Sequence, residues 1–177
     1  MHEITIYTKN ASKEIIGNAV AYDKQDKKNL KEIYNKWMEL NEQIGALQGR
    51  RIMFPGELIE GIVCLHCDMW KVTNSIARSF DLWDPNADDG KNRVVVYATT
   101  SVVFQMLLPE KLIGSVDRVL LMKLFISKGQ SLKYEIYDFD IEQILNLDNS
   151  KYMERRKIIK FEDLKEIPYN NIYVGEL

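Results

Sequence analysis

The middle of the chain, from residue 80 to residue 101, holds two strand-like segments separated by a stretch of turn-forming residues. The first segment is Phe80–Trp83, and the stretch after it, Asp84–Gly90, consists almost entirely of Asp, Asn, Pro and Gly. In the second segment, Arg93–Ser101, side chains alternate across the strand, so that one face is apolar and the other is mostly polar. This pattern predicts a β-hairpin within a sheet, whose polar face either lines a site or meets solvent.

The other segments surround this hairpin with both helices and strands. Strands are predicted at 4–8, 116–127, 132–137 and, as an edge strand, 171–174, and helices at 27–47, 57–74 and 141–147. The elements do not alternate regularly enough for a doubly wound fold, so we expect an α/β (α+β) protein with a mixed central sheet flanked by helices. A chain of 177 residues is long enough for one domain with a substantial core, and we expect residues 1–177 to form a single domain.

The first long helix is amphipathic. Its apolar residues recur at intervals of three and four, and the opposite face is charged, which predicts one face against the core. Gly49 is expected to end this helix. The apolar positions are Leu30, Ile33, Tyr34, Trp37, Leu40, Ile44 and Leu47.

The overall charge does not favour nucleic acid, but it does not exclude it. The net charge is −2 at pH 7, and a nuclease gathers carboxylates around its metal, which offsets basic residues elsewhere. No apolar run approaches the length of a membrane span, and the first residues alternate like a strand rather than a signal peptide. We therefore expect a cytoplasmic protein without a membrane partner.

Two local motifs suggest metals but fit them poorly. Cys64, His66 and Cys67 lie close together in a predicted helix, but the only other histidine is His2, so a four-ligand zinc site is not favoured over a buried helix face. The turn that begins at Asp84 starts like a calcium-binding loop but lacks that loop's glycine and glutamate. We interpret it as a solvated hairpin turn.

Several segments, in order along the chain, resemble small type II restriction endonucleases of the PD-(D/E)xK superfamily. The resemblance covers Leu40 to about Ile141 and implies a restriction-endonuclease-like fold, double-stranded DNA as partner, Mg²⁺ as cofactor and hydrolysis of a phosphodiester. The segments that carry it are Leu40–Arg51, Pro55, Glu60–Cys64, Ser79–Asp84, Val95–Ser101, Asp117–Leu121 and Tyr134–Asp138.

The resemblance also implies where the site lies. Glu60, with Glu57 as a weaker alternative, matches a helix glutamate that precedes the site, and Asp81 matches the metal-binding aspartate of the first hairpin strand. In such enzymes the carboxylates hold Mg²⁺ against the scissile phosphate, and a lysine orients or helps to deprotonate the attacking water. Asp84 is a candidate second metal ligand.

The chain departs from the pattern at the acidic-x-lysine pair of the second hairpin strand, where Val95 and Tyr97 stand. Valine cannot bind a metal, and tyrosine, with an ordinary pKa near ~10, is a poor substitute for an ammonium group. The chain is then an inactive relative that still binds DNA, or other residues supply the missing groups, or the resemblance extends to the scaffold alone. The candidates for the missing groups are Asp84, Asp88, Asp89, Lys91 and Lys123.

DNA contacts are predicted from two basic clusters and a hydroxyl-rich run. Arginine can hold a guanine edge or a phosphate with two hydrogen bonds, lysine can pair with phosphate, and hydroxyl groups can donate to phosphate oxygens. Because palindromic sites favour two-fold proteins, a homodimer is expected. A non-cutting DNA-binding protein and an interaction domain without nucleic acid stay open as alternatives. The candidates for DNA contact are Arg50, Arg51, Thr99, Thr100, Ser101, Arg155 and Arg156, with Lys157 and Lys160 nearby.

Overall fold

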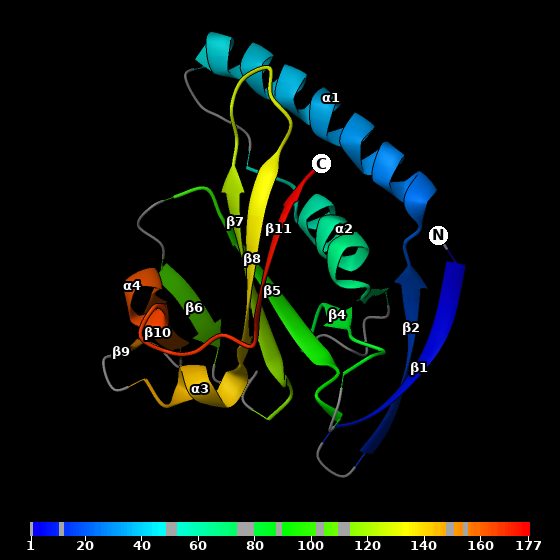
Figure 1. Cartoon of the computed structure of the whole chain (residues 1–177), viewed down its shortest axis with the longest axis vertical. Helices are drawn as coiled ribbons and strands as arrows, with labels where there is room; N and C mark the ends of the chain where they lie inside the picture. Colours follow the sequence, from blue (N-terminus) through cyan, green and yellow to red (C-terminus); the bar gives the residue numbers. More distant parts are fainter. Residues whose placement is uncertain are drawn as a thin grey trace.

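A computed structural model describes residues 2–10, 13–48, 53–73, 80–87, 90–101, 105–109, 114–147, 151–153 and 156–177. Its centre is an eight-stranded sheet in the order β1-β2-β3-β4-β5-β7-β8-β11 (Figure 1). The pairing of β5 with β7 is parallel and the other pairings are antiparallel, so the predicted mixed central sheet is confirmed. The strands are β1 (His2–Asn10), β2 (Lys13–Ala21), β3 (Trp70–Val72), β4 (Leu82–Trp83), β5 (Arg93–Thr99), β7 (Arg118–Phe125), β8 (Lys133–Asp140) and β11 (Asn171–Glu176).

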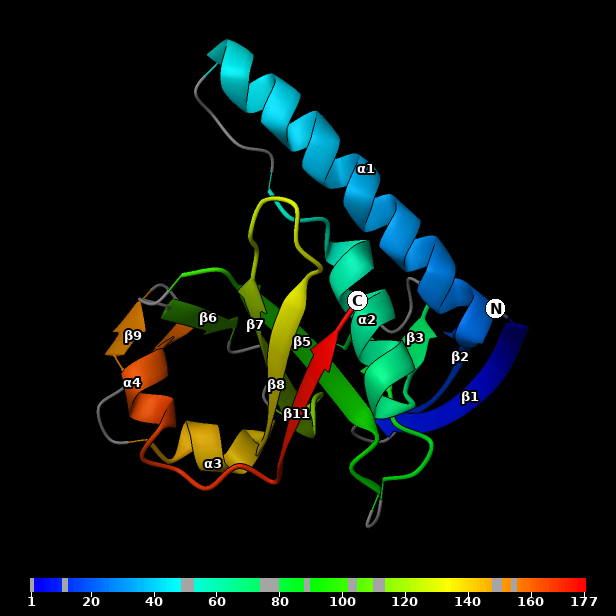
Figure 2. The ribbon, with the colours of Figure 1, turned by 45° about the horizontal axis from the view of Figure 1, so that its top comes forward.

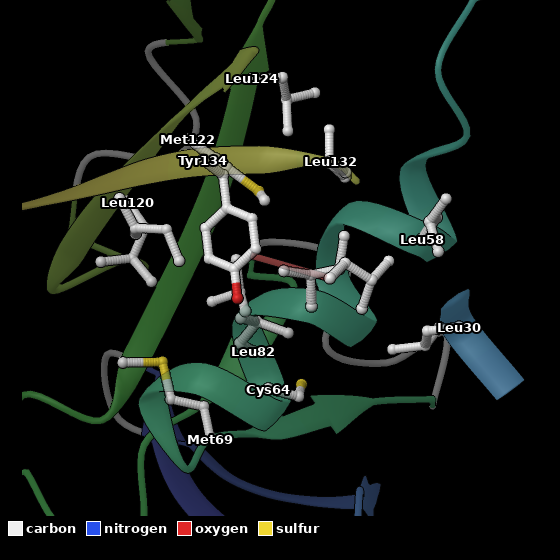
Figure 3. Packing of buried hydrophobic residues seen from close by; sticks show 14 of the residues in the cluster. Leu30, Leu58, Cys64, Met69, Leu82, Leu120, Met122, Leu124, Leu132 and Tyr134 are labelled. Atoms are coloured by element: carbon white, nitrogen blue, oxygen red, sulfur yellow. The ribbon is translucent and has the colours of Figure 1, made fainter. Parts of the chain in front are cut away.

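Two helices cover one face of this sheet. The helix α2 (Gly56–Cys67) lies against the strands, and the longer α1 (Lys24–Gln48) crosses over α2 on its outer side (Figures 1 and 2). The core between α2 and the sheet is apolar: Leu58 and Cys64 of α2 pack with Leu120 and Met122 of β7 (Figure 3). This core fixes the position of α2 over β4, β5 and β7.

A smaller layer covers the opposite face of the sheet. It contains a three-stranded sheet in the order β6-β10-β9 and the short helices α3 and α4 (Figure 2). A second apolar cluster, which includes Val119, Phe139 and Ile144, fills the space beneath it. The elements are β6 (Gln105–Pro109), β9 (Lys151–Met153), β10 (Arg156–Lys160), α3 (Ile141–Leu145) and α4 (Phe161–Leu164).

Two helix predictions need correction. The second predicted helix, 57–74, ends at Cys67 because Asp68 adopts a left-handed conformation with φ of 57°. The chain then extends into β3, which pairs with both β2 and β4. The apolar face of α1 is only partly buried, since Leu30 is 6% exposed whereas Leu47 is 85% exposed. The predicted end of α1 at Gly49 lies outside the described residues.

Most of the other strand predictions are confirmed with shifted ends, including the edge strand β11. The strands β2, β6, β9 and β10 were not predicted. Within the described residues, no helix combines the length and apolar character that a membrane crossing needs.

Candidate active site where β4 and β5 diverge

The site begins at Asp81, one residue before the two-residue strand β4. Its backbone still pairs on both sides: the N–H donates to the carbonyl of Val94 at 2.9 Å, and the carbonyl accepts from the N–H of Val72 at 3.0 Å. Further along β5, the N–H of Val96 donates to the side chain of Asp81 and not to a strand backbone: its acceptor is Oδ2, at 2.9 Å. The sheet therefore opens between β4 and β5 at this point, and the Asp81 carboxylate is held at the opening.

Glu60 and Lys71 approach this opening from α2 and β3. Nζ of Lys71 lies 2.8 Å from Oε2 of Glu60, and the two side chains are 19% and 25% exposed. Burial by itself would lower the pKa of Lys71, but the hydrogen bond to Glu60 and the negative charge of Glu60 outweigh it, so the pKa lies above its ordinary value. At neutral pH the pair is therefore an ammonium group beside a carboxylate.

The charges of Glu60 and Lys71 also act on Asp81. Burial raises the pKa of Asp81, and the nearby Glu60 carboxylate raises it further, whereas the Val96 N–H and the Lys71 ammonium oppose the rise. The three groups thus form one electrostatic cluster although α2, β3 and the start of β4 contribute one side chain each. A second positive charge placed between the two carboxylates would relieve their mutual repulsion.

The two faces of β5 meet different surroundings. Residues paired across strands share a face, so Lys71, Leu82 and Val94 all point toward α2. Val96 packs against the apolar cluster between α2 and the sheet, whereas Val95 belongs to the cluster on the opposite face of the sheet.

Tyr97 packs with the same opposite cluster as Val95. Tyr97 nevertheless lies within electrostatic reach of the site, because burial and the charge of Asp81 raise its pKa to about 12. From Val94 to Ala98, neither face of β5 carries a carboxylate or a lysine.

Asp84 takes part in a different cluster. Its carboxylate accepts hydrogen bonds from the guanidinium of Arg118 and from the N–H of Asn86, the latter at 2.9 Å. Arg118 also binds both carboxylate oxygens of Asp138, and all three charged side chains belong to buried residues. The role of Asp84 as a metal ligand stays a prediction, in competition with this buried ion-pair cluster.

The two candidate lysines for the missing ammonium group make contacts of their own, and Lys123 pairs in register with Thr99 at the end of β5. Nζ of Lys91 pairs with Oδ2 of Asp140 at 2.7 Å. Nζ of Lys123 lies over the ring of Phe125, 5.1 Å from its centroid. The candidate carboxylates Asp88 and Asp89 lie outside the described residues.

Among the predicted DNA contacts, Thr99 ends β5 and its Oγ1 accepts the N–H of Ser101 at 3.0 Å. Thr100 and Ser101 are exposed and follow β5 on the side where the sheet has opened. Arg156 begins β10. Arg50, Arg51 and Arg155 lie outside the described residues, so the structure gives no position for them.

A family model for the Bsp6I restriction endonuclease matches residues 22–159. The chain belongs to this family. No curated protein and no solved structure matches it. The match extends from the end of β2 into β10, so it includes α2, β3, β4 and β5, which build the opening. The mixed sheet flanked by helices is consistent with the restriction-endonuclease-like fold that the sequence predicted.

In this restriction endonuclease family member, the described residues contain no group of three or more His, Cys, Asp or Glu side chains that could hold a metal ion. The opening offers two carboxylates instead, from Glu60 and Asp81. Carboxylate oxygens are the ligands that Mg²⁺ uses, and Mg²⁺ is commonly held by one or two of them together with water and phosphate oxygens. The residues present therefore fit a magnesium site of that kind.

Lys71 is the site residue that sequence reasoning missed. It stands between Trp70 and Val72, and the segment was interpreted as the end of a helix, where a lysine is an ordinary surface residue. The alternation of two large apolar residues around a charged one was the available signal, because it is typical of a strand with one polar face.

Proposed function

We propose that this protein is a Mg²⁺-dependent restriction endonuclease of the PD-(D/E)xK superfamily that hydrolyses a phosphodiester bond in each strand of duplex DNA. The observation that carries the proposal is the Asp81 carboxylate, held by the Val96 N–H where β4 and β5 diverge and within electrostatic reach of Glu60, and the family match supports it. The sequence resemblance implies a role at the site for both residues.

The chain's own groups have separate tasks in this mechanism. Glu60 and Asp81 would hold Mg²⁺, which polarises the scissile phosphate and lowers the pKa of a bound water. Asp81 is fixed for this by the Val96 N–H, so its carboxylate does not need to reorganise when DNA binds. Tyr97 keeps its proton at neutral pH and serves as a hydrogen-bond donor to a phosphate oxygen at the edge of the site.

DNA is held by residues on two sides of the opening. We assign phosphate contacts to Thr99, Thr100 and Ser101, which directly follow the opened part of β5. The arginines proposed for base or phosphate contact are Arg50, Arg51, Arg155 and Arg156.

The proposed active form is a homodimer. Each chain offers one opening between β4 and β5, and the two strands of a duplex are antiparallel, so a symmetric pair places one site on each strand. Sedimentation analysis with and without DNA checks this, and twice the chain mass is expected in the cutting complex.

Cleavage is tested on long DNA molecules that together contain every short recognition sequence, with Mg²⁺ and with other divalent ions. The wild-type protein should give discrete fragments, and chelation of the metal should stop cutting. Asp81→Asn should abolish cutting while DNA binding is kept, whereas Glu142→Gln, on the exposed side of α3, should cut normally.

Each other outcome has a separate meaning. Salt-sensitive DNA binding without cutting under any divalent ion would identify a DNA-binding protein that does not hydrolyse DNA. Absence of binding even at low salt would leave an interaction domain. Normal cutting by Asp81→Asn would show that the metal ligands lie elsewhere.

A further inference from the structure

We propose that Lys71 is the catalytic lysine of this enzyme, so that the ammonium group missing from β5 is supplied by β3. The inference rests on the proposed endonuclease function and deepens it. It concerns the residue that contacts the attacking water, in a site whose carboxylates are Glu60 and Asp81.

The placement of Lys71 follows from the register of the sheet. Lys71 pairs with Leu82, so its side chain leaves β3 on the face covered by α2, and its charge acts on Asp81, the residue before Leu82. The same face carries Glu60, whose Oε2 lies 2.8 Å from the Lys71 Nζ. An ammonium group is therefore in place beside Glu60 and within electrostatic reach of Asp81.

The short length of β4 explains how a different strand can supply the lysine. The strand β4 lies between β3 and β5 but has only two residues. Where it diverges from β5, side chains from both neighbouring strands border the same opening. Lys71 of β3 and position 97 of β5 both lie within electrostatic reach of Asp81, so either strand could supply an ammonium group to that carboxylate.

Burial separates Lys71 from the surface lysines. Among the described residues, three lysine–carboxylate ion pairs occur, and the lysine side chains are 19% exposed in Lys71, 49% in Lys91 and 83% in Lys128. Holding an ammonium group largely out of water has a desolvation cost, and a well-packed apolar side chain would avoid it. Its neighbours Trp70 and Val72 are apolar, so the local strand does not require a charge at this position.

In the reaction, the oxygen of a water molecule forms a bond to phosphorus and the bond from phosphorus to the leaving oxygen breaks. The leaving oxygen keeps the bonding electron pair and takes up a proton, and the attacking water releases one, so the proton balance is closed. The Lys71 ammonium donates a hydrogen bond to the attacking oxygen and stabilises its hydroxide form. Through its bond to Glu60, it also fixes that carboxylate at the site.

The test compares Lys71→Met with the wild type and with Lys128→Met, a matched loss of an exposed lysine that pairs with Glu42. Single-turnover cleavage is measured with enzyme in excess over DNA, together with DNA affinity in Ca²⁺ and the unfolding midpoint. We expect Lys71→Met to stay folded, to bind DNA within a few-fold of the wild type, and to cut about 10²–10⁴-fold more slowly. Lys128→Met should match the wild-type rate.

A second variant protects the test from a trivial loss of structure. In Lys71→Met combined with Tyr97→Lys, an ammonium group returns at the position of β5 where the family pattern has lysine, and the rate should rise by at least about 10-fold over Lys71→Met alone. A purely structural ion pair between Lys71 and Glu60 predicts no such recovery. An unchanged rate in the double variant would therefore count against the catalytic role of the Lys71 ammonium group.

The two proposals fail in different ways. Wild-type cutting, loss of cutting in Asp81→Asn and a normal rate in Lys71→Met would overturn the role of Lys71 and leave the endonuclease function intact. Absence of cutting by the wild-type protein under all divalent ions would overturn both.

Discussion

Replacement of Arg118 by Met should strongly destabilise this protein, because the residue neutralises two buried carboxylates at the start of β7. Its guanidinium binds Asp84 and both carboxylate oxygens of Asp138. The three residues are 8%, 8% and 2% exposed respectively. Met roughly keeps the side-chain length but leaves two carboxylates out of water with no cation.

The expected magnitude follows from that burial. Removal of one partner from a buried ion pair typically costs about 3–5 kcal/mol, because an uncompensated charge stays behind. This is a large part of the about 5–15 kcal/mol that stabilises a typical domain. The matched control is Lys91→Met, since Lys91 is 49% exposed in its pair with Asp140 and such surface pairs contribute about 0–1 kcal/mol.

Urea unfolding followed by tryptophan fluorescence and circular dichroism gives both free energies of unfolding. The deficit of Arg118→Met should shrink between pH 7 and pH 4. Burial raises the pKa of Asp138 and Arg118 opposes that rise, so in the variant this carboxyl group takes up a proton as the pH falls and the cost of its buried charge disappears. A loss no larger than that of Lys91→Met, or a deficit independent of pH, would refute the view that Arg118 neutralises a buried acidic pair.

Three further predictions concern other parts of the molecule. Gly175→Ala should lower the free energy of unfolding in urea by about 1–3 kcal/mol, because the new Cβ would lie 2.6 Å from the ring of buried Tyr134. The control is Gly56→Ala, whose Cβ would have no atom within 4 Å and which should change that free energy by no more than about 0.5 kcal/mol. Equal effects would contradict the close packing at β11. Burial and the charge of Lys27 lower the pKa of His66, so the unfolded chain takes up the proton at a higher pH than the folded chain does. The free energy of unfolding should therefore fall from pH 7 to pH 5, and His66→Gln should reduce this slope. An unchanged slope in the variant would refute the prediction. Asp84→Asn should lower stability but leave single-turnover cutting by the folded protein intact, and loss of cutting would make Asp84 a metal ligand.

The sequence predicted the elements whose signal is local. The helix that became α1 and the strands around the hairpin follow from residue periodicity, which depends on one segment at a time. The mixed sheet flanked by helices followed from their order. The strands β6 and β10 pair with each other across a long stretch of chain, and β2 also pairs with the distant β3, so tertiary pairing supports them as much as local preference does. The hairpins β1-β2 and β9-β10 join neighbouring segments and were missed for want of a strong local signal.

The candidate site divides in the same way. Glu60 and Asp81 were predicted from sequence, since a resemblance in order and spacing marks them directly. Sequence could also show that β5 lacks an acidic-x-lysine pair, but not which lysine stands nearby. Only the tertiary structure decided that, because three pieces of chain meet where a two-residue strand lets the sheet open. That meeting brings Lys71 to Glu60 across a gap of eleven sequence positions that no local pattern spans.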